Sequence, residues 1–277
     1  MQTNKVFEVL QTAISNQVQS PLVDASLFML SKPEPQEGAF NNGEQLPMLF
    51  IYLLNYFSKY AVSQFINEAG VNADIADPIG VVVVQVFSRP EFLWRGESMI
   101  HILMSKIRIA CPVLFGVRAL EATEEGRARL GWIREGTKQA PGPYVSEDIH
   151  GTRMAGLAAG YAALALRDFS KSKMKNPWHP TNYWQSMASI VSTPTAQRST
   201  TQYIVLRAMI DGYEGTFLKF YGNAALAALA VALVKFPYEA RATDSTVPPK
   251  SSSVSGVAVL ADKLKRDRGI VLPEMPK

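Results

Sequence analysis

The fold class is decided by the stretch Glu97-Ser-Met-Ile-His-Ile-Leu-Met-Ser-Lys-Ile-Arg-Ile-Ala-Cys-Pro-Val-Leu-Phe-Gly116. Its apolar residues recur at the spacing of one wide helical face. Pro112 has no backbone N–H and disfavours helical geometry at the residue before it, so we expect the helix to end near Ala110. The stretch therefore predicts a buried helix, with Glu97 in its first turn, where a negative charge suits the helix dipole.

The same helical spacing continues on both sides of this stretch. Proline, glycine and capping residues divide it into segments of ordinary helix length. The further predicted helices are 6–14, 22–30, 48–69, 79–87, 146–169, 180–193, 200–221, 223–236 and 254–268, and 123–132 is predicted to form a short amphipathic turn. Only 79–87, which is rich in valine, also resembles a strand, but a lone strand has no partner for its backbone groups.

These segments predict an all-α fold in which the helices pack pairwise, as in a HEAT-like irregular helical repeat. No repeat of fixed period is visible, and we expect one domain over 1–277. Its longer connections are a loop at 32–46, a loop at 136–145 and a linker at 244–253 before the last helix.

Composition sets the broad class of the protein. The chain has 277 residues, of which 47% are hydrophobic and 19% charged, values that suit a globular core. Its net charge is +4, and a mild overall excess of basic residues does not by itself indicate a nucleic-acid site. The single cysteine, Cys111, excludes an internal disulfide and a cysteine-rich zinc site, and we expect it to be buried and unreactive.

The N-terminus and the apolar runs of the sequence indicate whether the chain has a signal peptide or a membrane span. The N-terminus lacks the basic and then apolar pattern of a signal peptide. The longest strongly apolar run, Ala224–Val234, is shorter than the ~20 residues that a membrane span requires. We therefore expect no membrane span. Because the chain begins abruptly within a helical pattern, we interpret it as a piece of a longer protein.

The usual signs of catalysis are absent from the sequence. The three histidines, His101, His150 and His179, lie on different predicted elements and lack metal-ligand spacing. Neither a glycine-rich phosphate loop nor a GxSxG elbow occurs. We expect no catalytic residues and no metal site, so a binding or regulatory module is favoured over an enzyme.

Two cations differ from the rest because they interrupt largely apolar helices. Lys59 and Lys106 have few acidic residues near them in sequence. They either extend their charged ends from a core helix into water or hold a compact polyanion together. The basic groups at 171–175 and 263–268 are simply explained as a solvated loop and as the basic last turn of a helix.

Five short motifs resemble the C-terminal domain of the Gle-one family of mRNA export factors. They occur in the family's order and cover nearly the whole chain. The motifs are Phe57-Ser-Lys-Tyr-Ala-Val-Ser-Gln64, Ile107-Arg-Ile-Ala-Cys-Pro-Val-Leu-Phe-Gly116, Gly126-Arg-Ala-Arg-Leu-Gly-Trp132, Arg153-Met-Ala-Gly156 and Phe220-Tyr-Gly-Asn-Ala-Ala225.

The resemblance implies a helical domain at the cytoplasmic face of the nuclear pore, present also in the cytoplasm and nucleus. It implies a non-enzymatic activator of the ATPase of the DEAD-box RNA helicase of mRNA export. In well-known members inositol hexakisphosphate bridges the activator and the helicase. The family domain also binds the C-terminal segment of a phenylalanine–glycine nucleoporin, and translation initiation and termination factors are further implied partners.

The resemblance transfers the inositol-phosphate site only in part. Lys59 and Lys106 fall on family cations, whereas Ser63 stands where the family has a histidine. Ile109 and Ala110 replace two family lysines. Because cations are lost, we expect weak binding of inositol hexakisphosphate.

Two further cations are accessory candidates for this site. A family lysine near the start of the domain corresponds either to Lys5 or to a position before this chain. Arg108 lies two residues from Lys106, so the two side chains point to nearly opposite sides of a helix.

One alternative function comes from another class of protein. A HEAT-type translation-factor scaffold would also bind a DEAD-box helicase. The cysteine–proline motif at 111–112 and the motif at 220–225 favour the mRNA export family.

Overall fold

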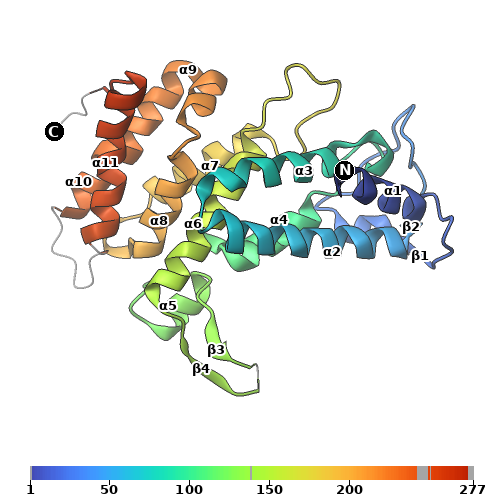
Figure 1. Ribbon diagram of the computed structural model, residues 1–277, viewed down its shortest axis with the longest axis horizontal. Helices are drawn as coiled ribbons and strands as arrows, with labels where there is room; N and C mark the ends of the chain where they lie inside the picture. Colours follow the sequence, from blue (N-terminus) through green and yellow to red (C-terminus); the bar gives the residue numbers. More distant parts are fainter. Residues whose placement is uncertain (1, 138, 242–248, 250, 274–277) are drawn as a thin grey trace.

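Helices make up most of the chain, as Figure 1 shows, and the predicted all-α class is confirmed. The computed structural model describes residues 2–137, 139–241, 249 and 251–273. The helices are α1 (Gln2–Ile14), α2 (Met48–Gln64), α3 (Ala76–Ser88), α4 (His101–Ala110), α5 (Glu124–Arg129), α6 (Glu147–Ala165), α7 (Pro180–Val191), α8 (Thr200–Ile210), α9 (Glu214–Ala230), α10 (Phe236–Arg241) and α11 (Ser251–Arg268). The strands are β1 (Leu22–Asp24), β2 (Gln45–Pro47), β3 (Arg134–Gly136) and β4 (Pro141–Tyr144).

Helix α6 lies at the centre of the molecule, between the N-terminal helices α1–α4 and the C-terminal helices α8–α11 (Figure 1). It contacts α3, α7, α8 and the π-helical turn Phe65–Ala69 that continues α2. Almost all of its second half is buried. Its small residues permit this, because a Cβ atom on Gly156 would collide with the backbone of Phe65 and Gly70.

Helix α4 ends at Ala110 as predicted, and Cys111 behind it is fully buried. The predicted start was wrong, because the helix begins at His101. Glu97 instead pairs with Trp94 in a tight turn, in which Gly96 has a positive φ of 76°. The indole of Trp94 fixes this turn by donating a hydrogen bond to the carbonyl of Gly43.

The short connections contain more structure than the sequence indicates. The predicted helix 22–30 is instead strand β1 followed by a 3₁₀ turn, because Leu22–Asp24 pairs with Gln45–Pro47. The predicted loop 32–46 therefore ends inside β2. The predicted loop 136–145 contains most of the hairpin β3–β4, which projects from the body in Figure 1, while residue 138 lies outside the described residues.

The segment 79–87 is helical, as predicted, within α3. The predicted single helix 200–221 is divided in two, because Gly212 adopts a φ of 86° between α8 and α9. Ser199 rather than Thr200 caps α8, through a reciprocal capping box with Gln202. The predicted boundary between the helices 200–221 and 223–236 corresponds to a kink inside α9, where Gly222 has a φ of 53°.

Helix α11 packs on α8, α10 and the π-helical turn Val231–Lys235. Its buried residues are Val254, Val257, Leu260 and Leu264. The helix starts at Ser251, inside the predicted linker 244–253. Residues 244–248 and 250 of that linker lie outside the described residues.

By length and composition, the helical stretch Glu214–Ala240 is apolar enough to cross a membrane. It is longer than the apolar run Ala224–Val234 on which the sequence prediction rested. Residues such as Phe217, Leu229 and Phe236 are buried in the core of this fold, and 33% of its apolar window is buried. The remaining residues of the window are exposed or half-buried.

Candidate functional site

The outward face of α2 carries the first predicted phosphate ligand. Tyr52, Tyr56, Lys59 and Ser63 follow one another at helical spacing, so they share one face. Both tyrosines and Lys59 are exposed, and the two rings stack with centroids 6.5 Å apart. The Ser63 hydroxyl accepts a hydrogen bond from the Asn67 amide at 3.0 Å. This face therefore offers one cation and two aromatic rings, which sequence reasoning did not single out although their i, i+4 spacing was visible.

Helix α4, which packs against α2, carries the second predicted ligand. Lys106 is half-buried, whereas Arg108 is exposed and its guanidinium lies 5.8 Å from the ring centroid of Phe115. Ile109, at a position where the resemblance expects a lysine, is 79% exposed. The exposed end of α4 is therefore partly apolar.

Lys5 is exposed on α1, which packs against α2. Together the predicted cations lie on three helices that contact one another through α2. Within the described part of the chain, no acidic side chain forms an ion pair with Lys5, Lys59, Lys106 or Arg108. Their charges are therefore available to an external anion.

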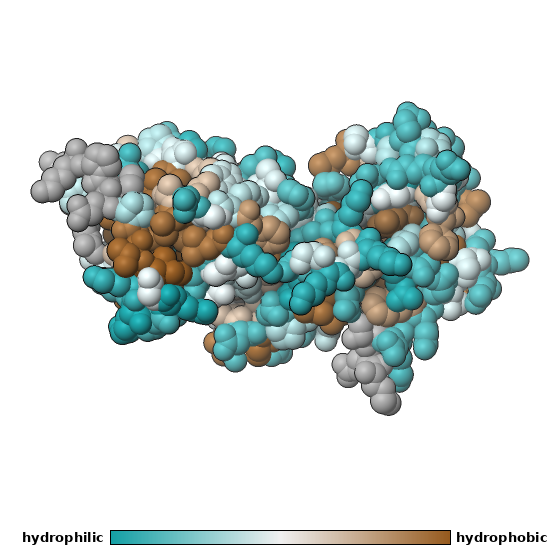
Figure 2. Space-filling model, turned by 90° about the horizontal axis from the view of Figure 1, so that it is seen from above, coloured by the Kyte–Doolittle hydropathy of each residue, from teal (hydrophilic) through white to brown (hydrophobic). Residues whose placement is uncertain are grey.

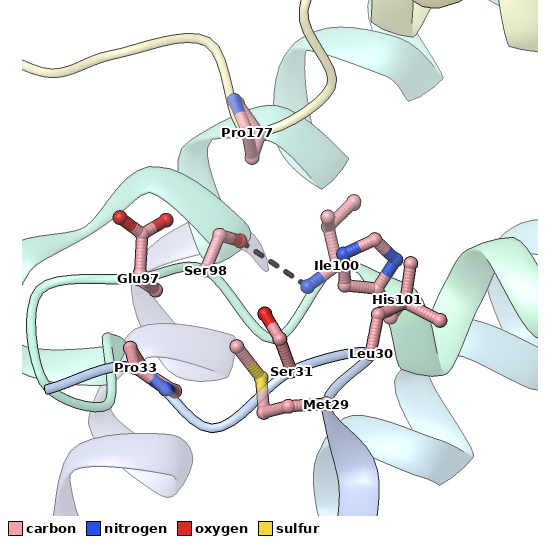
Figure 3. A pocket seen from close by; sticks show the side chains of 9 residues that line it. All are labelled: Met29, Leu30, Ser31, Pro33, Glu97, Ser98, Ile100, His101 and Pro177. Atoms are coloured by element: carbon pink, nitrogen blue, oxygen red, sulfur yellow. Dashed lines mark hydrogen bonds between the residues drawn. The ribbon is translucent and has the colours of Figure 1, made fainter.

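A small pocket of about 250 Å³ lies beside the start of α4 (Figure 3). His101 lines it and meets the Trp178 ring edge to face, with centroids 5.9 Å apart. Burial lowers the pKa of His101. The neighbouring Ser98 hydroxyl donates its proton to the carbonyl of Phe87 at 2.6 Å, so it does not face His101 as a nucleophile would. His101 is half-buried at the wall of this pocket.

A second cluster joins residues that are far apart in sequence. The His150 ring stacks on Trp132 at 3.9 Å between centroids, and its Nε2 lies 2.9 Å from the Thr201 hydroxyl. The Thr201 hydroxyl donates to the Glu121 carboxylate, which also accepts a hydrogen bond from the Trp132 indole at 3.0 Å. Because the one proton of Thr201 is used in this way, Nε2 of His150 must be the donor to Thr201.

The contacts of this cluster hold α8 against α6 and the segment 121–132. Burial, with help from the nearby charges of Arg153 and Arg127, lowers the pKa of His150 to about 3. The imidazole is therefore neutral near pH 7, and Glu121 acts as a second cap for α8 by accepting from the Thr201 backbone N–H. Sequence reasoning could not find this cluster, since its members come from four separate segments.

The Cys111 thiol is not reactive near pH 7. Burial raises the pKa of the Cys111 thiol to about 12, so the thiolate that would react or bind a metal is absent near pH 7. Among the residues that the structure describes, no group of three or more histidine, cysteine, aspartate or glutamate side chains could hold a metal ion.

Comparison with known proteins gives concordant matches. Residues 1–233 match the family described as GLE1-like protein. The chain is 52% identical over 268 residues, 97% of its length, to mRNA export factor GLE1 of Chaetomium thermophilum. It is 24% identical over 181 residues to mRNA export factor GLE1 of Saccharomyces cerevisiae. The chain spans 48% of the first relative and 32% of the second, about half their length or less.

A solved structure has the same fold. It is the complex of the C-terminal domain of S. cerevisiae Dbp5 with Gle1 and IP6. The match has a TM-score of 0.66 at 20% identity and covers 83% of this chain and 74% of the other.

Proposed function

The chain belongs to the GLE1-like protein family of mRNA export factors, and from this membership we propose that it activates the ATPase of a DEAD-box RNA helicase in nuclear mRNA export. The observation that carries the proposal is the 52% identity to a curated export factor over 97% of the chain. The solved complex of related fold, which contains a helicase domain and IP6, supports the choice of partner. The chain would act by binding the helicase, without catalytic residues of its own.

The inositol-phosphate contact would lie on the outward faces of α2 and α4. Lys59 and Lys106 would contact the phosphates, with Lys5 and Arg108 as accessory cations. Ser63 and the exposed Ile109 supply no charge there. Inositol hexakisphosphate would therefore bind weakly, and direct contacts with the helicase would contribute most of the affinity.

Docking at the cytoplasmic face of the nuclear pore would use a different surface. Figure 2 shows an apolar area over the C-terminal helices. The outward residues of α9, α10 and the turn between them include Phe220, Val234 and Tyr238, all exposed. A phenylalanine–glycine nucleoporin segment, which is apolar, suits this surface. Val234→Glu should then weaken binding of that segment, whereas Val71→Glu, at a valine that is 82% exposed elsewhere, should not.

The ATPase rate of the helicase tests the main proposal. We would measure the RNA-stimulated rate of the cognate export helicase with and without this chain, each with and without inositol hexakisphosphate. We expect stimulation by the chain alone and little further increase with the inositol phosphate. Stimulation only with the inositol phosphate would contradict the weak site, and an active helicase that is never stimulated would contradict activation.

A further inference from the structure

A groove runs along the outer side of α8, away from the proposed phosphate ligands. It consists of two pockets, of about 490 Å³ and 380 Å³, that share the side chains of Ile204, Ser252 and Ser253. The larger pocket lies between the start of α6 and the start of α11. The smaller one continues toward Asp211 at the end of α8. The two pockets therefore adjoin each other along α8, and we refer to them together as the groove.

The groove has the length of a short extended peptide. From Thr200 to Asp211, α8 rises by about 16 Å at ~1.5 Å per residue. An extended chain covers that distance in about five residues, at ~3.3 Å each. The floor and walls of the groove include apolar side chains at Leu120, Ile204 and Ala208. These would contact alternate side chains of an extended peptide.

Most charged groups that line the groove already have partners. Arg198 donates to two backbone carbonyls and to Glu239, and Arg127 stacks over Trp132. Glu121 belongs to the buried cluster with Thr201. At the other end Asp211 pairs with Lys263 at 2.6 Å.

Two further exposed charges, Asp148 and Arg207, lie one in each pocket. Asp148, in the first turn of α6, lines the larger pocket, and Arg207, on α8, lines the smaller one. Neither forms an ion pair with another residue of the described ranges. A segment in the groove would thus meet a negative charge at the start of α6 and a positive charge near the end of α8.

We infer that this groove binds a linear segment of a partner protein, about five residues long and extended. The segment carries a basic residue that pairs with Asp148, apolar residues that cover Ile204, and an acidic residue that pairs with Arg207. This charge order fixes its direction along α8. The site is separate from α2 and α4, so it does not depend on activation of the helicase.

A displayed library of random hexapeptides, selected on the full chain, tests the inference. We expect enrichment of peptides in which a basic and an acidic residue flank apolar positions in one constant order. Asp148→Lys with Arg207→Glu should select the opposite order and weaken the best wild-type peptide by about fivefold or more, as two exposed ion pairs would. Asp262→Lys with Lys265→Glu, which exchanges two exposed charges of α11 outside the groove, should change neither result.

Ile204→Glu, which places a charge in the shared wall, should abolish selection. Circular dichroism and thermal unfolding of each variant would establish that it is folded. The inference is overturned if no peptide is enriched over the empty support. It is equally overturned if folded Ile204→Glu selects the same peptides, or if the charge-exchanged variant keeps the wild-type order.

Discussion

At the scale of single residues, the cations on α2 and α4 determine how the chain responds to inositol hexakisphosphate. Adding Ser63→His, Ile109→Lys and Ala110→Lys would restore the charges that the family resemblance expects. We predict at least tenfold tighter binding, about what charge-assisted contacts provide after discounting for solvent exposure. Titration calorimetry with Lys59→Ala and Lys106→Ala in the restored background should show the gain disappear.

A matched control places the same number of new basic residues, three, elsewhere. Leu27, Leu30 and Val71 are strongly exposed and lie off the outward face of α2. Lysines at these three positions should not tighten the binding of inositol hexakisphosphate to the same extent. If they did, general electrostatic attraction would explain the gain, and the assignment of the site to α2 and α4 would be contradicted.

His150 predicts a pH dependence of stability. Its pKa falls from 6.5 in the unfolded chain to about 3 in the fold. Above pH 6.5 both states are neutral and the stability is at its full value. As the pH falls below 6.5 only the unfolded state binds the proton, so stability declines by up to about 1.4 kcal/mol per pH unit.

Thermal unfolding between pH 7 and 4.5 would measure this slope. His150→Phe keeps an aromatic ring on Trp132 and removes the titrating group, so its melting temperature should be lower but should fall less steeply with pH. A residual slope is expected from His101, whose pKa burial also lowers. An unchanged slope in the variant would show that His150 is not the group responsible.

How much of the site could be predicted depended on whether its residues are local. Lys59 was identified from its apolar helix, and it is exposed on the outward face of α2. Its binding role and that of Lys106 stay predictions. The cluster of Glu121, Trp132, His150 and Thr201 was not predictable, because only tertiary packing brings α8 beside residues up to 80 positions earlier.

At the scale of elements, replacing a glycine with alanine should have opposite effects on stability in α6 and in α9. Gly156→Ala should destabilise the fold by about 3 kcal/mol, because the new methyl group meets backbone atoms that cannot rotate away. Gly215→Ala, in the first turn of α9 with nothing within 4 Å of the new Cβ atom, should stabilise it by about 0.5 kcal/mol. Urea unfolding of both variants measures the difference, and equal effects would contradict this view of α6.

The errors in predicting elements have physical causes. The helix 79–87 was predictable because its valines had no strand with which to pair. The helix predicted at 22–30 was wrong because Leu22–Asp24 does have a partner strand, which lies more than twenty residues later in the chain. The division between α8 and α9 depends on a positive φ at Gly212, and a glycine tolerates helical and left-handed geometry alike.

At the scale of the whole molecule, two ion pairs hold α11 against the body. Lys263 pairs with Asp211 at 2.6 Å, and Arg268 lies 3.5 Å from Glu214, whose side chain is 4% exposed. Removing Arg268 would leave a buried carboxylate without its cation. We predict that Arg268→Ala costs about 1 kcal/mol, a value reduced by the exposure of the arginine.

Chemical unfolding of three variants would separate this pair from general effects. Glu214→Gln combined with Arg268→Ala should recover most of the loss, because the uncompensated charge is gone. Arg266→Ala is the control, since Arg266 is 74% exposed and, among the described residues, forms an ion pair only with its neighbour Asp267. A loss from Arg266→Ala as large as that from Arg268→Ala would refute the assignment.

The position of α11 also matters while the protein is being made. The chain leaves the ribosome from its N-terminus, so α8, α10 and the turn Val231–Lys235 emerge before α11, the helix that packs on them. During that interval the apolar stretch Glu214–Ala240 is in water and is long enough for factors that deliver nascent chains to membranes to recognise it. Until α11 has left the ribosome, folding of the nascent chain competes with its delivery to a membrane and with its capture by chaperones. Packing of α11 ends this period.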